Sequence, residues 1–98
     1  MGARRHASVV DVTIDGRLPH GSEVAVRHGD HEVQATVGWL GGPYHQLRCA
    51  DALTAGYGDA IEVGGLPGTV LDPQARKQGP SNDLLVRLTN LARDAPPR

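Results

Sequence analysis

A run of alternating apolar and polar residues between positions 22 and 50 constrains the fold of this chain more than any other feature. The alternation passes through VAV at 24–26 and then through VQATV at 33–37. A period of two residues is typical of strands that bury one face. The pair Gly29-Asp30 separates the two segments, and both residue types suit a tight turn. The sequence therefore predicts a hairpin, which a third strand at 44–50 extends into a meander.

Three shorter segments continue the strand pattern on either side of this meander. They are His6–Ile14, Ala60–Val63 and Thr69–Leu71. Glycines and Pro67 interrupt the alternation at 64–68, and Asp72-Pro73 ends the last strand because proline cannot donate to a strand ladder. We expect residues 51–58 to be a connection that crosses one end of the fold. Six strands result.

Small aliphatic side chains must fill the interior of such a fold. The chain of 98 residues contains no Phe, two Tyr and one Trp. Side chains of this size suit a narrow barrel or a sandwich with a filled interior better than a wide ligand-binding cup. We therefore predict an all-β fold, a small six-stranded β-barrel. Its expected interior residues are Val10, Val12, Val24, Val26, Val33, Val37, Leu47, Ile61 and Val70.

A single amphipathic helix is predicted after the last strand. Ser81 can cap a helix over residues 82–93, in which Leu84, Leu88 and Leu91 form an apolar stripe. We thus expect a barrel domain at 1–73, a basic linker at 74–80 and a helix at 81–94. The stripe should pack on the outside or the end of the barrel.

The charge balance limits the partners that this chain can attract. Ten Lys and Arg against eleven Asp and Glu give a formal net charge of -1. Strong sequence-independent attraction to phosphate backbones is therefore not expected, and any nucleic-acid contact has to be a local patch. The sequence has one Cys, no signal-peptide pattern and no run of about 18 apolar residues, so a cytoplasmic protein without a membrane partner is expected.

No pattern of catalytic or metal-ligating residues stands out. The five His are scattered over different predicted strands and a loop, which is a poor arrangement for zinc. His45 and Cys49 lie four residues apart on one predicted strand, about 13 Å along it, which is too far for a catalytic pair. No GxxxxGK[S/T] phosphate loop is present. We expect a non-catalytic protein with no metal and no cofactor, and a buried, inert thiol.

Two small basic spots are the candidates for nucleic-acid binding. Arg76 and Lys77 are adjacent in the predicted linker, and Arg27 and His28 lie beside the tip of the first hairpin. The alternative is that both spots are ordinary solvated turns, since surface arginines need no partner. Trp39 continues an inward-facing alternation, so it is interpreted as a core or seam anchor rather than a platform for stacking bases.

The order of these elements resembles a domain of a translation factor. The matching segments are VRHGDHEVQATV, QLRCADAL, the pair Gly58-Asp59 entering a strand, and VLDP before a basic linker. Together they cover roughly residues 20–94 and resemble domain III, the second β-barrel, of the bacterial selenocysteine-specific elongation factor. The segment at 63–68 departs from the family pattern because it is shorter and carries Pro67.

The resemblance implies a six-stranded Greek-key barrel of the elongation-factor domain III type and a binding role in translation. In that family the barrel helps to hold the aminoacylated tRNA arm and packs against the GTPase domain. The partners implied are therefore tRNA or a translation GTPase, with the basic spots described above as the contacts to RNA. The alternative is a barrel recruited to bind a small molecule or a partner protein outside translation. The barrel alone would not deliver tRNA at the expense of GTP.

Overall fold

The computed structural model describes residues 8–75 and 81–94. Its elements are β1 (Ser8–Ile14), β2 (Glu23–His28), β3 (His31–Gly41), β4 (Tyr44–Cys49), β5 (Ala60–Val63), β6 (Leu66–Asp72) and α1 (Asn82–Asp94). The predicted all-β fold with a C-terminal helix is confirmed. In the described part of the chain, no helix has the length and apolar character needed to cross a membrane.

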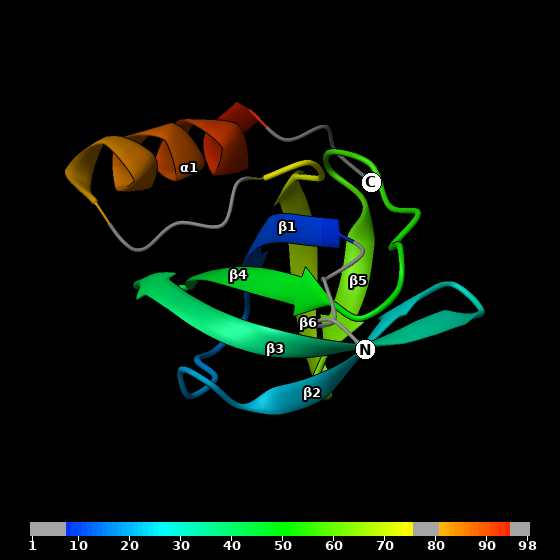
Figure 1. Cartoon of the computed structure of the whole chain (residues 1–98). Helices are drawn as coiled ribbons and strands as arrows, with labels where there is room; N and C mark the ends of the chain where they lie inside the picture. The colour runs from blue at the N-terminus through cyan, green and yellow to red at the C-terminus, as the bar shows by residue number, and fades with distance from the viewer. Residues whose placement is uncertain (1–7, 76–80, 95–98) are drawn as a thin grey trace, which may run out of the picture.

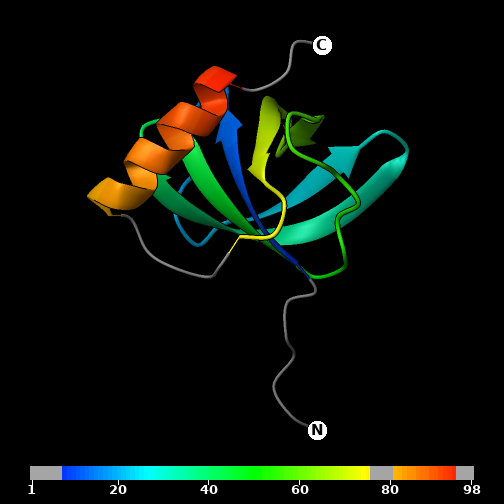
Figure 2. The ribbon, with the colours of Figure 1, turned by 90° about the horizontal axis from the view of Figure 1, so that it is seen from above.

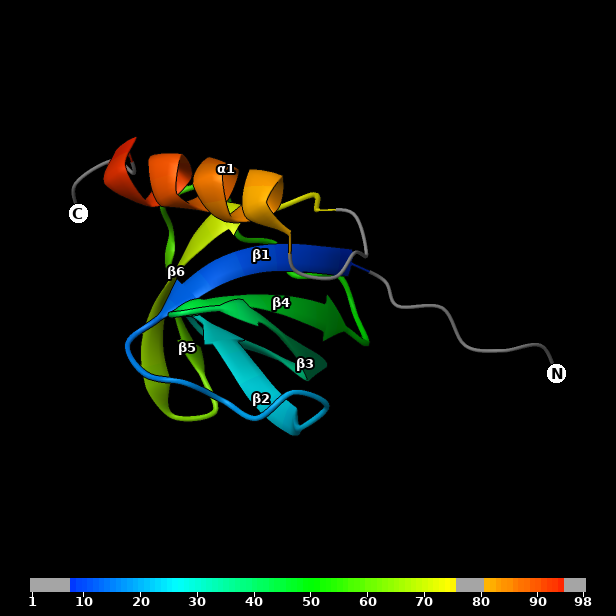
Figure 3. The same ribbon diagram turned by 90° about the vertical axis from the view of Figure 1, so that its left-hand side faces the viewer.

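The six strands form a closed antiparallel barrel (Figure 1). The order around the barrel is β1-β4-β3-β2-β5-β6, and pairing of β6 with β1 closes it (Figure 3). β2, β3 and β4 form a meander, and β1 lies beside β4 rather than beside β2. This arrangement is a Greek key. The connection from β4 to β5 has to cross one end of the barrel, as the sequence predicted.

Aliphatic side chains from all six strands fill the interior of the barrel. Leu53 and Ala55 of the β4–β5 connection add to this cluster and are each 7% exposed. Of the interior residues predicted from the sequence, Val24 is half-buried against the cluster and the others are buried. The buried members of the cluster are Val10, Val12, Ile14, Val26, Val33, Ala35, Val37, Leu47, Cys49, Leu53, Ala55, Ile61, Val63 and Val70.

The glycine-rich segment at 64–68 corrects one expectation. Gly64-Gly65, with φ of 56° and 85°, forms a two-residue turn that pairs Val63 with Leu66. Both turn positions need a positive φ, which glycine adopts without strain. Pairs alternate between hydrogen-bonded and non-hydrogen-bonded along an antiparallel ladder, and the pair that closes a two-residue turn, here Val63–Leu66, is hydrogen-bonded. The next pair, Glu62–Pro67, is not hydrogen-bonded, so Pro67 is tolerated inside β6: its nitrogen points away from β5. The last strand therefore begins at Leu66 rather than at Thr69.

Helix α1 lies across the outside of the barrel (Figure 2). Oγ of Ser81 accepts a hydrogen bond from the N–H of Leu84 at 3.2 Å, which is the predicted N-cap. Leu84 and Leu88 are buried against Leu40 and Leu71 on the outer face of the barrel. We call this second cluster the seam. Its partly buried margin consists of Tyr44, Leu91 and Ala92.

Candidate nucleic-acid interface

Arg27 projects from β2 close to the tip of the first hairpin. Its guanidinium lies 3.4 Å from the carboxylate of Glu32 on β3, and its side chain is 60% exposed. Glu62 of β5 is its register partner on the other side. An exposed ion pair of this kind is weak and can exchange one anion for another. The predicted contact of Arg27 with phosphate stays a prediction, and it would have to compete with two carboxylates.

His28, the neighbour of Arg27, is tied to the β4–β5 connection. Its Nε2 lies 3.2 Å from Oδ2 of Asp59, and the same oxygen accepts the N–H of Gly56 at 2.8 Å. The pair fixes the connection beside the first hairpin. The other two predicted residues, Arg76 and Lys77, lie outside the described residues. The structure therefore does not show whether the two basic spots come together, and all four assignments stay predictions.

Three other arginines have no ion pair with a carboxylate within residues 8–75 and 81–94: Arg17, Arg48 and Arg93. Arg17 stacks on Trp39, with its guanidinium carbon 4.0 Å from the ring centroid. The indole N–H of Trp39 donates to the carbonyl of Gly42 at 3.0 Å. Trp39 is half-buried, so it is an anchor at the barrel end that is covered in part by a cation.

Arg48 lies on the outer face of β4. Its Nε donates to Oε1 of Gln46 at 3.4 Å, and its guanidinium lies over Gly38 of β3. Glycine at position 38 leaves room for this placement because it has no side chain. A guanidinium without a carboxylate partner within the described chain can bind a phosphate without first breaking an ion pair.

Two histidines fasten the loop between β1 and β2 to the barrel end. Nε2 of the buried His45 accepts the N–H of Leu18 at 3.1 Å, and its Nδ1 lies 2.9 Å from the carbonyl of Pro43. These partners require a neutral ring with the proton on Nδ1. Burial lowers the pKa of His45 in agreement with this state. His20 of the loop accepts the N–H of Trp39 at 3.1 Å.

A buried carboxyl group lies on β1 beside Asp72, the residue of β6 that binds α1. Asp11 of β1 is fully buried; its Oδ1 accepts a hydrogen bond from Nε2 of Gln46 at 3.1 Å, while Oδ2 has no partner within the described chain. Burial raises the pKa of Asp11 to about 6, against the opposing effect of the Gln46 hydrogen bond. The neighbouring Asp72 is instead satisfied, by Arg87 at 2.8 Å and by the N–H of Gln74 at 3.0 Å.

The thiol of Cys49 is buried inside the barrel, where its Sγ lies 4.0 Å from the carbonyl of Leu47. Burial raises the pKa of this thiol, so it is protonated at neutral pH. In the part of the chain that the structure describes, no three His, Cys, Asp or Glu side chains converge as a metal site would require.

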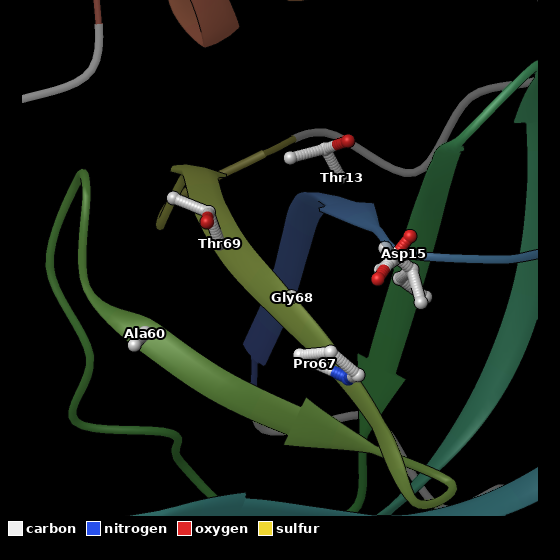
Figure 4. A pocket seen from close by; sticks show the side chains of 7 residues that line it. Thr13, Asp15, Ala60, Pro67, Gly68 and Thr69 are labelled. Carbon is white, nitrogen blue, oxygen red and sulfur yellow. The ribbon is translucent and has the colours of Figure 1, made fainter.

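A shallow hollow of about 490 Å³ opens on the outer face of β1, β5 and β6. Thr13 and Thr69, which are partners across the two strands, place their hydroxyl groups near it, and Asp15 adds the one carboxylate among its lining residues (Figure 4). Gly68 has no side chain here because a Cβ would lie 2.8 Å from the carbonyl oxygen of Thr13. The hollow suits the binding of a small protruding group of a partner better than the enclosure of a whole ligand.

No protein family, curated protein sequence or solved structure matches this chain.

The sequence predictions missed residues whose positions depend on the closed barrel. For His45 a signal existed, because the alternation through Leu47 and Cys49 places it on the inner face. For Asp11 the alternation gave only the outer face, and nothing in the sequence showed that this position would be buried. For Arg48, availability to a phosphate depends on where the nearest carboxylates lie in three dimensions, which the sequence does not show.

Proposed function

We propose that this chain is a non-catalytic binding module that docks tRNA or a translation GTPase, as its resemblance to domain III of the selenocysteine-specific elongation factor implies. The observation that carries the proposal is the filled interior of a closed barrel. A barrel whose interior is filled by the side chains of its described residues binds through its outer surface, and such a surface suits a large partner better than a small molecule.

Three of the four segments that carry the resemblance form turns and junctions of this barrel, which supports the proposed relation to a barrel of this type. VRHGDHEVQATV forms the β2–β3 hairpin, and Asp59 caps the N–H of Gly56 before β5 begins. VLDP ends β6, where Asp72 holds both the following turn and α1. These three segments therefore shape a turn or a junction of the barrel.

Contacts to RNA are proposed for the cations that can reach phosphates. Arg27, His28, Arg76 and Lys77 remain the candidates from the sequence. Arg48 joins them because it has no carboxylate partner within the described chain and is held by Gln46. About three such contacts would give a salt slope of roughly -2 to -3, so binding of tRNA to this barrel alone is expected to be weak.

The test is tRNA binding across a salt series, for the unmodified chain and for two charge-reversed variants, Arg48→Glu and the double variant Arg76→Glu with Lys77→Glu. Each lost phosphate contact should reduce the slope by about 0.9. Arg93→Glu, which changes an exposed arginine in the last turn of α1, is the matched control. Circular dichroism establishes that each variant is folded.

An unchanged affinity and slope would remove the altered residues from the interface. No measurable tRNA binding by the unmodified chain at low salt would instead favour a barrel recruited to bind a protein or small molecule. The hollow beside Thr13 and Asp15 is the feature that supports this second candidate. Its single lining carboxylate would prefer a cationic group, and replacing Asp15 by Asn would then weaken binding of that partner.

A further inference from the structure

Asp11 is the buried group that neither the fold nor the proposed function explains. It lies on the outer face of β1, and its register partner on β6 is Asp72, which Arg87 of α1 binds. Leu71, the residue before Asp72, packs against Leu84 and Leu88 of the same helix, so α1 lies over this part of the barrel. The carboxyl group of Asp11 is fully buried, and Oδ2 has no partner within the described chain. A buried, ionised and half-satisfied carboxylate is costly, whereas a protonated carboxyl group is much less so.

The charges that face Asp11 come from three elements packed around it. Asp72 of β6 is its register partner, and Arg87 of α1 binds Asp72 rather than Asp11. On β4, Gln46 is neutral and holds Oδ1, while Arg48 donates to the other end of Gln46. Two carboxylates therefore share one nearby guanidinium from the helix. A proton on Asp11 is the simplest species that neutralises the second carboxylate.

We propose that Asp11 is a proton-binding site that couples the docking of α1 to pH. At mildly acidic pH, Asp11 takes up a proton when the helix closes over the barrel; when the helix opens, Asp11 is hydrated and releases it. The proposal concerns the contact between α1 and the barrel and does not depend on the proposed function.

The direction of the effect follows from linkage. The pKa of Asp11 rises from 3.8 to about 6 when the group is buried, so the docked state binds the proton more tightly than the open state. Docking is therefore strengthened as pH falls through about 6 and weakened above it. With these two values, the docking equilibrium should change about tenfold between pH 7.5 and pH 5.

Helix α1 is separable enough for such an effect to be seen. Its buried residues belong to the seam, a cluster distinct from the barrel interior. Among the described residues, its polar contacts with the barrel are the Arg87 ion pair and two hydroxyl contacts, Tyr57 to the carbonyl of Leu91 at 2.7 Å and Tyr44 to Thr89 at 3.3 Å. Each of these contacts can break while every strand ladder stays intact.

Two measurements on the full chain test the proposal. In a carboxyl-detected NMR titration, Asp11 should titrate with a midpoint near 6. In amide hydrogen exchange, the protection factors of α1 should be about tenfold higher at pH 5 than at pH 7.5. The variant Asp11→Asn, which resembles the protonated group, should lose this dependence. Asp15→Asn, an exposed carboxylate just beyond the same strand, is the matched control and should keep it.

A midpoint for Asp11 below 4.5 in the unmodified chain would overturn the proposal, and this measurement does not depend on whether any variant folds. Equal protection of α1 at the two pH values would overturn it as well. The same conclusion would follow if Asp11→Asn kept the full pH dependence, because another group would then be responsible.

Discussion

The barrel interior and the seam under α1 are built from the same aliphatic residue types but differ in whether the buried polar groups beside them have hydrogen-bond partners. In the interior, both ring nitrogens of His45 have hydrogen-bond partners. Beside the seam, one oxygen of Asp11 has none within the described chain. Six closed ladders hold the interior, whereas one helix covers the seam. A region whose buried polar groups all have hydrogen-bond partners opens only at high free energy. A region that buries a polar atom without a partner opens more readily.

The largest effect is expected from a charge placed inside the barrel. Val37→Asp buries an unpaired carboxylate at a position that is 1% exposed, which costs several kcal/mol against a total stability of about 5 to 10. The variant should be unfolded by circular dichroism. The control is Val86→Asp on α1, which should fold normally because Val86 is 61% exposed. A folded Val37→Asp variant with an intact barrel would contradict the description of the interior.

A cavity in the seam should act locally. Leu88→Ala removes a fully buried side chain and should weaken docking of α1 by about 2–4 kcal/mol, while the strands remain folded. Amide exchange would show lost protection in α1 and retained protection in β3 and β4. Val86→Ala, at an exposed site of the same helix, should change little. Equal loss of protection in helix and strands would show that the two regions do not separate.

The two regions should respond to acid in opposite directions. The pKa of His45 is lowered by burial, so the unfolded chain binds the proton more tightly, and the barrel loses stability as pH falls below the ordinary histidine pKa of 6.5. Protonation would also break the bond from Leu18 to Nε2. The effect is best measured by urea unfolding followed through Trp39, in an Asp11→Asn background that removes the opposing titration. His45→Gln should flatten this acid dependence, and an unchanged dependence would assign it elsewhere.

The smallest effect is expected from the ion pair that joins the regions. Arg87 is 55% exposed, so Arg87→Gln should cost no more than about 1 kcal/mol. Because the positive charge of Arg87 lowers the pKa of Asp11, its removal should move the Asp11 midpoint upward. Carboxyl-detected NMR reports this shift directly. A downward shift would mean that Arg87 does not face Asp11.

The interior was predictable from the sequence because alternation alone decides which residues face inward. Val26, Val33 and Val37 needed only a period of two. The seam was only half predictable: the stripe of Leu84 and Leu88 was visible, but the barrel residues beneath it were not. Which outer face a helix covers depends on closure of the sheet and on the path of the chain after β6, and neither leaves a periodic signal.

The candidate interface was the least predictable region because a charge in the sequence does not show its partners. Arg27 and His28 seemed uncompensated in one dimension, yet Glu32 and Asp59 lie beside them in the fold. Arg48 drew no attention in the sequence and has no carboxylate partner within residues 8–75 and 81–94. Compensation between charges is set by strand register, which becomes clear only when the barrel is closed.

The most direct test of the difference between the two regions is native-state amide exchange of the unmodified chain at increasing urea concentrations. The amides of α1 are predicted to open at a lower free energy and with a weaker urea dependence than those of β3 and β4, because opening the seam exposes little surface. If the helix and strand amides showed the same free energy and the same urea dependence, the barrel and helix would form one cooperative unit, and the account would be wrong.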